Sequence, residues 1–181
     1  MKGFVPTPRA TVDKMVDLLF RGRQPKPTDT VLDPGCGTGE FIDGVIRWCH
    51  QRRLPPPRVT GVESDPRHLP ALRAKYDRLR AIRIEHADFL VAGQGAYDYI
   101  VGNPPYVPIT GLSETEKARY RARYATAHGR FDLYLLFFEE SLRRLAPDGR
   151  LVFITPEKYL YVQTAAPLRE LLARRRVEEI R

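Results

Sequence analysis

The sequence predicts an α/β fold built on a doubly wound, mostly parallel sheet. First, the β-prone stretch Thr30–Asp33 runs directly into a glycine loop and then into a helix. Second, further short strands that end in acidic residues alternate with helical segments. Third, residues 151–154 form a continuous apolar run, typical of a strand covered on both faces. With 181 residues, the chain is long enough for one domain with a substantial core.

The first half of the chain supplies three strands and their connecting helices. An amphipathic helix is expected over residues 10–20, where Val12, Met15, Val16 and Leu19 fall on one face. Helical spacing follows the glycine loop from Phe41 onward. The other expected elements of this half are a strand at Arg58–Glu63, a helix over residues 66–76 and a strand at Ile82–His86.

The second half begins with a strand at Tyr97–Gly102. Ser113 followed by Glu116 predicts a capped helix over residues 113–124. Apolar residues on several faces predict a long buried helix over residues 131–145, whose aromatic side chains belong mostly to the core. The remaining expected elements are a strand at residues 151–154, a helix over residues 164–175 and a last strand that begins at residues 177–180.

The glycine loop contains Pro34, Gly35, Cys36 and Gly37. Glycines let the backbone approach a ligand closely, and the following helix offers free N–H groups. The spacing is neither that of a dinucleotide fingerprint nor that of a P-loop. Asp33 just before the loop would repel a pyrophosphate but suits a ligand with an ammonium group. A purely structural glycine turn is the alternative interpretation.

Two acidic residues follow at strand ends. Glu63, at the tip of the second strand, is placed to accept both hydroxyls of a ribose. Asp88 can accept from an adenine amino group, and Phe89 beside it can cover the ring. Each acid could instead be an ordinary solvated strand end, but their order along the chain favours a nucleoside site.

The most informative motif is Asn103, Pro104, Pro105 and Tyr106, directly after the strand Tyr97–Gly102. The side-chain carbonyl of Asn103 and a backbone carbonyl can accept both hydrogens of a planar substrate's NH₂ group. The prolines restrict the backbone, and Tyr106 offers a ring for stacking. The alternative is a proline-rich turn after a strand.

These motifs resemble those of S-adenosylmethionine-dependent N6-adenine DNA methyltransferases, in the class whose cofactor motifs precede the catalytic one. The resemblance covers nearly the whole chain and includes residues 5–8, 129–134 and 145–156. The segment between Tyr106 and residues 132–134 is similar to that of large modification enzymes, some with a fused nuclease. It implies a Rossmann-like class I methyltransferase core of type II restriction-modification methylases, from a prokaryotic cytoplasm.

The resemblance also implies residue roles. Thr7, Asp33 and the loop residues Pro34, Gly35, Cys36 and Gly37 would hold the methionine end of S-adenosylmethionine, and Glu63 its ribose. Asp88 would take the adenine amino group, between Phe89 and Pro105, with an apolar contact from Phe137. Asn103, which borders the cofactor, and the Pro104 carbonyl would bind the target amino group, and Tyr106 would stack on the base. Thr7 with Pro8 could instead simply cap the first helix.

The implied substrate is an adenine flipped out of double-stranded DNA, because a stacked and paired base cannot reach such a pocket. The formal net charge of +8, from 30 basic and 22 acidic side chains, suits a polyanionic partner. Arginines 119, 121 and 123 and the run 174–176 could meet phosphates, or each could belong to a solvated helix face.

Other functional classes find little support in the sequence. Cys36 and Cys49 cannot build a disulfide framework, so a reducing compartment is expected. The histidines are scattered and no Cys/His cluster has metal-binding spacing. The longest apolar run, residues 133–138, is too short to cross a bilayer, and no signal peptide is visible.

We expect residues 1–181 to be a single catalytic domain without a target-recognition domain. Relatives of this class continue past the last strand with a further hairpin and then a recognition domain. The chain is therefore expected to be the core of a larger or split enzyme, with recognition supplied by other segments or a subunit. The alternatives are a protein-glutamine methyltransferase acting on release factors, whose clamp is the same, and a cofactor-binding module that is inactive without its missing part.

Overall fold

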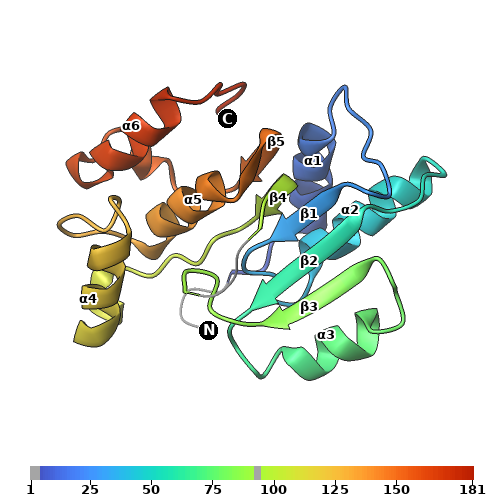
Figure 1. Ribbon diagram of the computed structural model, residues 1–181, viewed down its shortest axis with the longest axis horizontal. Helices are drawn as coiled ribbons and strands as arrows, with labels where there is room; N and C mark the ends of the chain where they lie inside the picture. Colours follow the sequence, from blue (N-terminus) through green and yellow to red (C-terminus); the bar gives the residue numbers. More distant parts are fainter. Residues whose placement is uncertain (1–4, 92–94) are drawn as a thin grey trace.

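The computed structural model describes residues 5–91 and 95–181. Within them, five strands form one sheet in the order β3-β2-β1-β4-β5, and every strand pair is parallel (Figure 1). The strands are β1 Thr30–Asp33, β2 Arg58–Glu63, β3 Ile82–His86, β4 Tyr97–Gly102 and β5 Leu145–Phe153. The α-helices are α1 Arg9–Leu19, α2 Glu40–Gln51, α3 Leu69–Tyr76, α4 Glu114–Arg123, α5 Leu133–Arg143 and α6 Ala166–Ala173. The predicted doubly wound α/β fold is confirmed.

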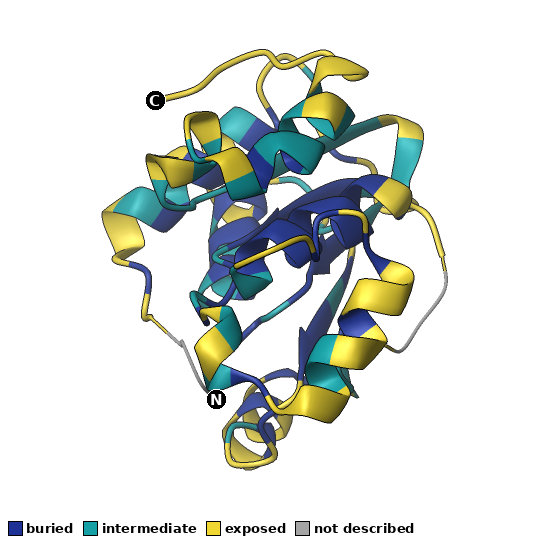
Figure 2. Cartoon of the chain, turned by 90° about the vertical axis from the view of Figure 1, so that its left-hand side faces the viewer, coloured by how far each residue is buried: buried dark blue, intermediate teal, exposed yellow. Residues whose placement is uncertain are grey.

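The sheet is covered on both faces because neighbouring residues of a strand point in opposite directions. In β4, Tyr99 and Val101 join a core cluster with residues of α1, α2 and α3, whereas Ile100 joins a second cluster with α4, α5 and α6. In β1, Val31 and Leu32 divide in the same way. Figure 2 shows the buried strands between the two helical layers. A strand of this sheet must therefore be apolar at consecutive positions, because both of its faces are buried.

Two glycines allow the close packing around α2. Gly39 precedes the helix in the left-handed conformation, with φ 90°, which lets the chain turn from the loop into the helix. Gly44 faces α1, and a Cβ at this position would lie 2.5 Å from Cγ1 of Val12. A side chain at Gly39 would collide with Tyr76 of α3, and one at Gly44 would push α2 away from α1.

Most predicted elements occur with small changes at their ends. The helix after Ser113 has the predicted capping box, in which the Ser113 hydroxyl accepts from the Glu116 N–H and the Glu116 carboxylate accepts from the Ser113 N–H. The predicted helix over residues 131–145 is confirmed as the shorter α5, which is buried along most of its length. Directly after α5 the chain joins the sheet beside β4. The first bond of this pairing runs from the N–H of Tyr97 to the Arg144 carbonyl, at 2.8 Å.

Strand β5 begins earlier than the strand predicted at residues 151–154. Leu145 pairs with Tyr97, and regular pairing resumes only where Arg150 faces Tyr99, so residues 146–149 form an irregularity in β5. Gly149 lies where a Cβ would come within 2.9 Å of the Tyr97 carbonyl oxygen. The apolar run predicted a strand only at residues 151–154, but pairing with β4 extends the strand back to Leu145.

The predicted strand at residues 177–180 is wrong. These residues form an exposed, irregular segment, with Val177 51% and Ile180 56% exposed. Within the described residues they pair with no strand; instead the Glu179 carboxylate meets the guanidinium of Arg21, in the turn after α1, at 2.9 Å. An apolar alternation becomes a strand only when a neighbouring strand accepts its backbone hydrogen bonds.

Candidate active site

A cavity of about 390 Å³ opens at the carboxyl ends of the strands, beside the glycine loop. This is the edge at which open α/β sheets bind ligands, and the volume lies in the usual range for small-molecule sites. Its lining includes six of the residues predicted to bind the cofactor: Pro34, Gly35, Asp88, Phe89, Pro105 and Phe137. The other lining residues are Val62, Ser64, Asp65, Pro66, Ala87, Val107, Leu112, Glu116, Tyr120 and Leu133.

One wall of the cavity is aromatic. The rings of Phe89 and Phe137 lie 5.2 Å apart between centroids, at an interplanar angle of 41°. Phe137 also faces the glycine loop, since a Cβ on Gly35 would be 3.6 Å from its Cε1. A planar heterocycle in this cavity would therefore meet apolar surface from three separate segments of the chain, with Pro105 as the third.

Glu63 has a structural function that sequence reasoning did not anticipate. Its carboxylate is completely buried and accepts from the N–H groups of Gly37, at 2.8 Å, and Asp65, at 2.6 Å. The acid thus ties the glycine loop to the end of β2. Ser64 and Asp65, which follow it, line the cavity instead. In the sequence, Ser64 and Asp65 directly follow Glu63 at the end of the predicted strand, and this position could have indicated that they face the ligand.

Asp65 is itself held in place by Arg67. The guanidinium meets the Asp65 carboxylate at 2.6 Å and lowers the pKa of that carboxyl, so Asp65 is charged at neutral pH. A negatively charged oxygen pair beside the cavity suits a ligand with hydroxyl groups.

Asp33 lies under the glycine loop and is only 1% exposed. Burial raises the pKa of Asp33 well above its ordinary value; the Gly35 N–H offsets this in part, while the charges of Glu40 and Glu63 add to it. The Gly35 N–H is near enough to lower the pKa of Asp33, but by distance and angle neither carboxylate oxygen has a hydrogen-bond partner among the described residues. Buried oxygens without partners suit a cationic group of a ligand.

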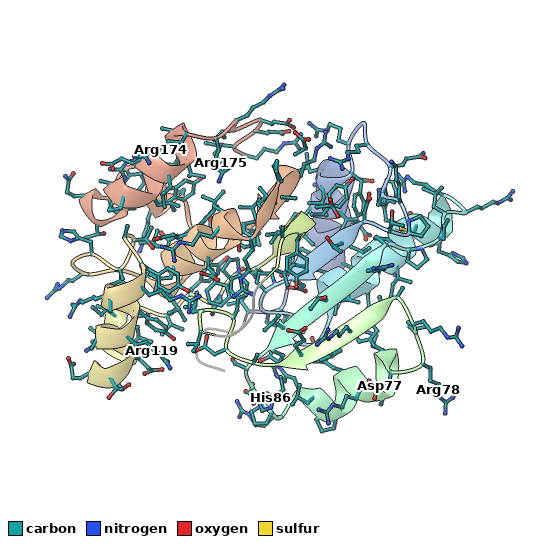
Figure 3. The ribbon with its side chains drawn as sticks, viewed as in Figure 1. Asp77, Arg78, His86, Arg119, Arg174 and Arg175 are labelled. Carbon is teal, nitrogen blue, oxygen red and sulfur yellow. The ribbon has the colours of Figure 1, made fainter. Side chains whose placement is uncertain are left out.

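Asp88 is approached by helix α4. One oxygen of Asp88 accepts from the Leu90 N–H at 3.0 Å. The other lies 3.5 Å from the Tyr120 hydroxyl and 3.6 Å from a guanidinium nitrogen of Arg119, which Figure 3 labels on α4. Burial, together with the nearby Asp88 charge, raises the pKa of Tyr120 to about 12. Helix α4 therefore forms part of the cavity wall.

The segment around Phe89 is braced from α5. Arg144 donates to the Phe89 carbonyl at 3.0 Å and to the buried Glu140 at 2.7 Å, and its guanidinium lies over the Phe89 ring. Tyr124 donates to the Leu90 carbonyl at 2.6 Å, and its oxygen lies 3.0 Å from Glu140. Such buried contacts fix the position of Phe89.

Asn103 is anchored by the start of the described chain. Its amide nitrogen donates to the Val5 carbonyl and to the Thr7 hydroxyl, both at 3.1 Å. Thr7 is buried, and its side chain does not cap α1, because Pro8 is the N-cap residue and no side-chain capping bond is present. The alternative interpretation of Thr7 as a helix cap is therefore wrong.

Tyr106 points back to the same amide. Its hydroxyl lies 2.5 Å from Oδ1 of Asn103 and 3.0 Å from the Ile154 carbonyl oxygen. The ring makes an edge contact with Tyr134, at 6.2 Å between centroids. Tyr106 thus meets the atom that was predicted to accept the target amino group.

Among the residues predicted to bind the cofactor, Thr7, Asp33, Cys36, Gly37, Glu63 and Asn103 lie outside the described cavity lining. Cys36 is buried, and a Cβ on Gly61 would be 3.0 Å from its sulfur, so its side chain packs into the core between strand and loop. No group of three or more potential metal ligands occurs in residues 5–91 and 95–181. Over the same residues, no helix has the length and apolar character needed to cross a membrane.

Several of the arginines considered for phosphate contacts interact with other groups of the chain. Arg123 donates to the Val91 carbonyl at 3.2 Å and approaches Glu140 at 3.4 Å, so its charge is used within the chain. Arg119 faces Asp88, with 46% of its side chain exposed. Arg174 and Arg175 follow α6 (Figure 3), and Arg175 reaches the Leu142 carbonyl at 3.4 Å.

Comparison with known proteins identifies the family. Residues 65–181 match the Eco57I restriction-modification methylase family, and residues 8–119 match the methyltransferase small domain. The chain belongs to the Eco57I restriction-modification methylase family. S-adenosylmethionine is accordingly its cofactor, and the aromatic wall, the carboxylates at the strand ends and the unpartnered Asp33 fit such a ligand.

Similar proteins include the type II methyltransferase M.TthHB8I of Thermus thermophilus, 36% identical over 95% of this chain and 39% of the relative. The type II methyltransferase M.PaeR7I of Pseudomonas aeruginosa is 29% identical over 96% of this chain and 35% of its own length. The chain thus spans well under half of these relatives.

Solved structures show the same fold. The methyltransferase subunit of a type I restriction-modification system from Streptococcus thermophilus superposes with a TM-score of 0.74, at 17% identity, over 96% of this chain and 39% of that one. The type IIG restriction endonuclease BpuSI gives a TM-score of 0.73 at 20% identity, over 94% of this chain and 22% of that chain.

Proposed function

We propose that this chain is the catalytic core of an enzyme that transfers a methyl group from S-adenosylmethionine to the exocyclic N6 of adenine in DNA. The observation that carries the proposal is the orientation of Asn103. Its amide nitrogen is bound to Val5 and Thr7, which leaves Oδ1 as the atom available to accept from a substrate. This carbonyl belongs to the segment that continues into Pro105, which lines the cofactor cavity.

The cofactor supplies an electrophilic methyl group when bound. The Asp33 carboxylate would pair with the ammonium group at the methionine end of the cofactor. Thr7 and the loop from Pro34 to Gly37 would lie beside that end. Asp88 would accept a hydrogen bond from the amino group of the cofactor's adenine, whose ring would lie between the apolar surfaces of Phe89, Pro105 and Phe137. The ribose is held at the end of β2, where Glu63 fixes the loop and Asp65 faces the cavity.

The chemistry at the target depends on two acceptors. Oδ1 of Asn103 and the carbonyl of Pro104 accept the two amino hydrogens of the target adenine. This favours a pyramidal nitrogen whose lone pair points at the methyl group, and it stabilises the positive charge that develops on nitrogen. As the nitrogen–methyl bond forms, the sulfonium–methyl bond would break and S-adenosylhomocysteine would leave as a neutral thioether. The methylated nitrogen then loses one proton to solvent, and no covalent bond to the protein is required.

The target adenine is flipped out of double-stranded DNA, since its amino group is otherwise inside the helix. Tyr106 then leaves Asn103 and stacks on the flipped base, which recovers part of the lost stacking energy. The net charge of +8 supports approach to a polyanion. Because relatives such as M.TthHB8I are more than twice as long, we infer that other chain segments or a subunit supply target recognition.

The proposal is tested by transfer of a tritiated methyl group from S-adenosylmethionine to adenine-containing DNA. An adenine opposite an abasic site lowers the cost of flipping, and it therefore serves as substrate beside the intact duplex. We expect N6-methyladenine in the wild type, and loss of transfer in Asn103→Ala with S-adenosylmethionine binding retained by calorimetry. Wild-type turnover in Asn103→Ala, or methylation of a release factor in place of DNA, would contradict it.

A further inference from the structure

The amide of Asn103 has no spare donor. Both hydrogens of its nitrogen are directed to acceptors, the Val5 carbonyl and the Thr7 hydroxyl oxygen, each 3.1 Å away. A planar amide has nearly the same shape when it is rotated by half a turn. The protein must therefore select which end of the amide faces the substrate, and only the carbonyl end can accept an amino hydrogen.

The two acceptors discriminate between the orientations. In the rotated amide, Oδ1 would face the lone pairs of the Val5 carbonyl, and two acceptors without a hydrogen between them repel each other. The Thr7 hydroxyl could donate to Oδ1 in that orientation, unless its hydrogen is already used elsewhere. The methionine end of S-adenosylmethionine, which we propose lies beside Thr7, carries a carboxylate that would take that hydrogen and leave Thr7 able only to accept.

The acceptors stand on a stiff segment. Val5 and Thr7 each precede a proline, and a residue before proline is held in an extended conformation. Thr7 is only 8% exposed, and the Pro8 carbonyl then accepts the first N–H groups of α1. The segment therefore holds its two acceptors in a fixed position relative to the end of β4.

We propose that Thr7, together with the Val5 carbonyl, is a positioning element that orients Asn103 with Oδ1 toward the target amino group. The inference rests on the proposed function of Asn103 and adds to it a residue that does not touch the target base. Because the Thr7 hydroxyl can accept from Asn103 and donate to the cofactor at the same time, cofactor binding strengthens the selection of the correct amide orientation.

The test compares Thr7→Val, which keeps the shape and removes the acceptor, with Thr7→Ser, which restores it. At saturating S-adenosylmethionine, Thr7→Val should lower the single-turnover rate of methyl transfer about ten-fold, whereas Thr7→Ser stays within about two-fold of the wild type. Thr126→Val is the matched control, because the Thr126 hydroxyl oxygen is buried and has no hydrogen-bond partner among the described residues. It should leave the rate unchanged.

If Thr7→Val weakens only cofactor affinity and reaches the wild-type rate at saturation, Thr7 serves the cofactor alone and the inference is overturned. A wild type without methyl transfer to any adenine substrate would overturn the proposed function. The amide geometry is measured independently by nuclear magnetic resonance of the free protein. The Asn103 side-chain protons should exchange slowly in the wild type and shift in Thr7→Val; fast exchange in the wild type would contradict the inference even if the enzyme is active.

Discussion

At the scale of single residues, a hydroxyl of the chain itself meets the carbonyl oxygen that we propose binds the target. The Tyr106 hydroxyl lies 2.5 Å from Oδ1 of Asn103, and it thus takes the place that we propose for an amino hydrogen of adenine. Its ring is kept in this position by Tyr134 and by the Ile154 carbonyl. A single side chain therefore has two proposed partners, the amide before binding and the base after it.

This arrangement separates the functions of the Tyr106 ring and hydroxyl. Tyr106→Phe keeps the stacking surface and frees Oδ1, so we expect the rate of methyl transfer to stay within about three-fold of the wild type. Tyr106→Ala removes the ring, and we expect DNA affinity to fall by about 1–3 kcal/mol, the value of one stacked base. Fluorescence titration with a duplex that carries a flippable adenine measures the DNA affinity of both variants, and single-turnover transfer to the same duplex measures their rates. Equal loss in Tyr106→Phe and Tyr106→Ala would refute stacking as the function of the ring.

At the scale of elements, the cofactor cavity is assembled from segments that are distant in the chain. The loop after β3 carries Asp88 and Phe89, α5 carries Phe137, and α4 contributes Tyr120 and Glu116. Their relative position depends on the buried network of Arg144, Glu140 and Tyr124 described above. Arg144 is the buried partner of Glu140, whereas Arg123 and Arg143 approach it at 3.4 and 3.8 Å from more exposed positions. Removal of the buried partner of a buried charge is costly.

We predict that Arg144→Met destabilises the protein by about 3–5 kcal/mol, because Glu140 then loses a buried cationic partner. The affinity for S-adenosylmethionine should fall as well, since the Phe89 carbonyl loses its donor. Urea unfolding and calorimetry measure the two effects. Arg83→Met is a suitable control: Arg83 is 77% exposed beside Glu85 and should cost less than about 1 kcal/mol. A loss in Arg144→Met no larger than in this control would contradict the proposed brace.

At the scale of the whole molecule, one buried carboxyl couples stability to pH. The pKa of Asp33 in the folded protein is raised by burial, whereas in the unfolded chain it has the ordinary value near 3.8. Below that value the acid is neutral in both states, and its contribution to stability is fully present. As the pH rises, the unfolded chain releases the proton first, so stability is lost until Asp33 ionises in the folded state.

Asp33→Asn removes this titration while keeping the shape of the side chain. We expect the variant to be more stable than the wild type above about pH 4, by a margin that grows by up to about 1.4 kcal/mol per pH unit. Its affinity for S-adenosylmethionine should be weaker, because the amide cannot pair with an ammonium group. Thermal unfolding between about pH 5 and pH 8 gives the first quantity and calorimetry the second. A stability difference that is constant with pH would show that Asp33 does not titrate in this way.

The sequence by itself determined the order of the elements and the edge of the sheet that carries the site. Periodicity, glycines and strand-end acids are local signals, and local signals are sufficient when each strand is buried on both faces. They predicted β1 to β4 and the capping box of α4. Among the six predicted residues that line the cavity, Pro105 and Phe137 came only from the resemblance to known methyltransferases. The same signals failed at residues 177–180, where a strand would need a neighbour that only tertiary structure can supply.

Only the tertiary structure decided how the side chains are used. It buried Glu63 between two backbone N–H groups, brought α4 to Asp88, and placed the hydroxyl of Tyr106 on Asn103. It also joined Thr7 to Asn103 across 96 positions of the chain. The physical reason is that a hydrogen bond depends on the distance and direction between two atoms, and residues remote in sequence acquire these only when the chain is packed.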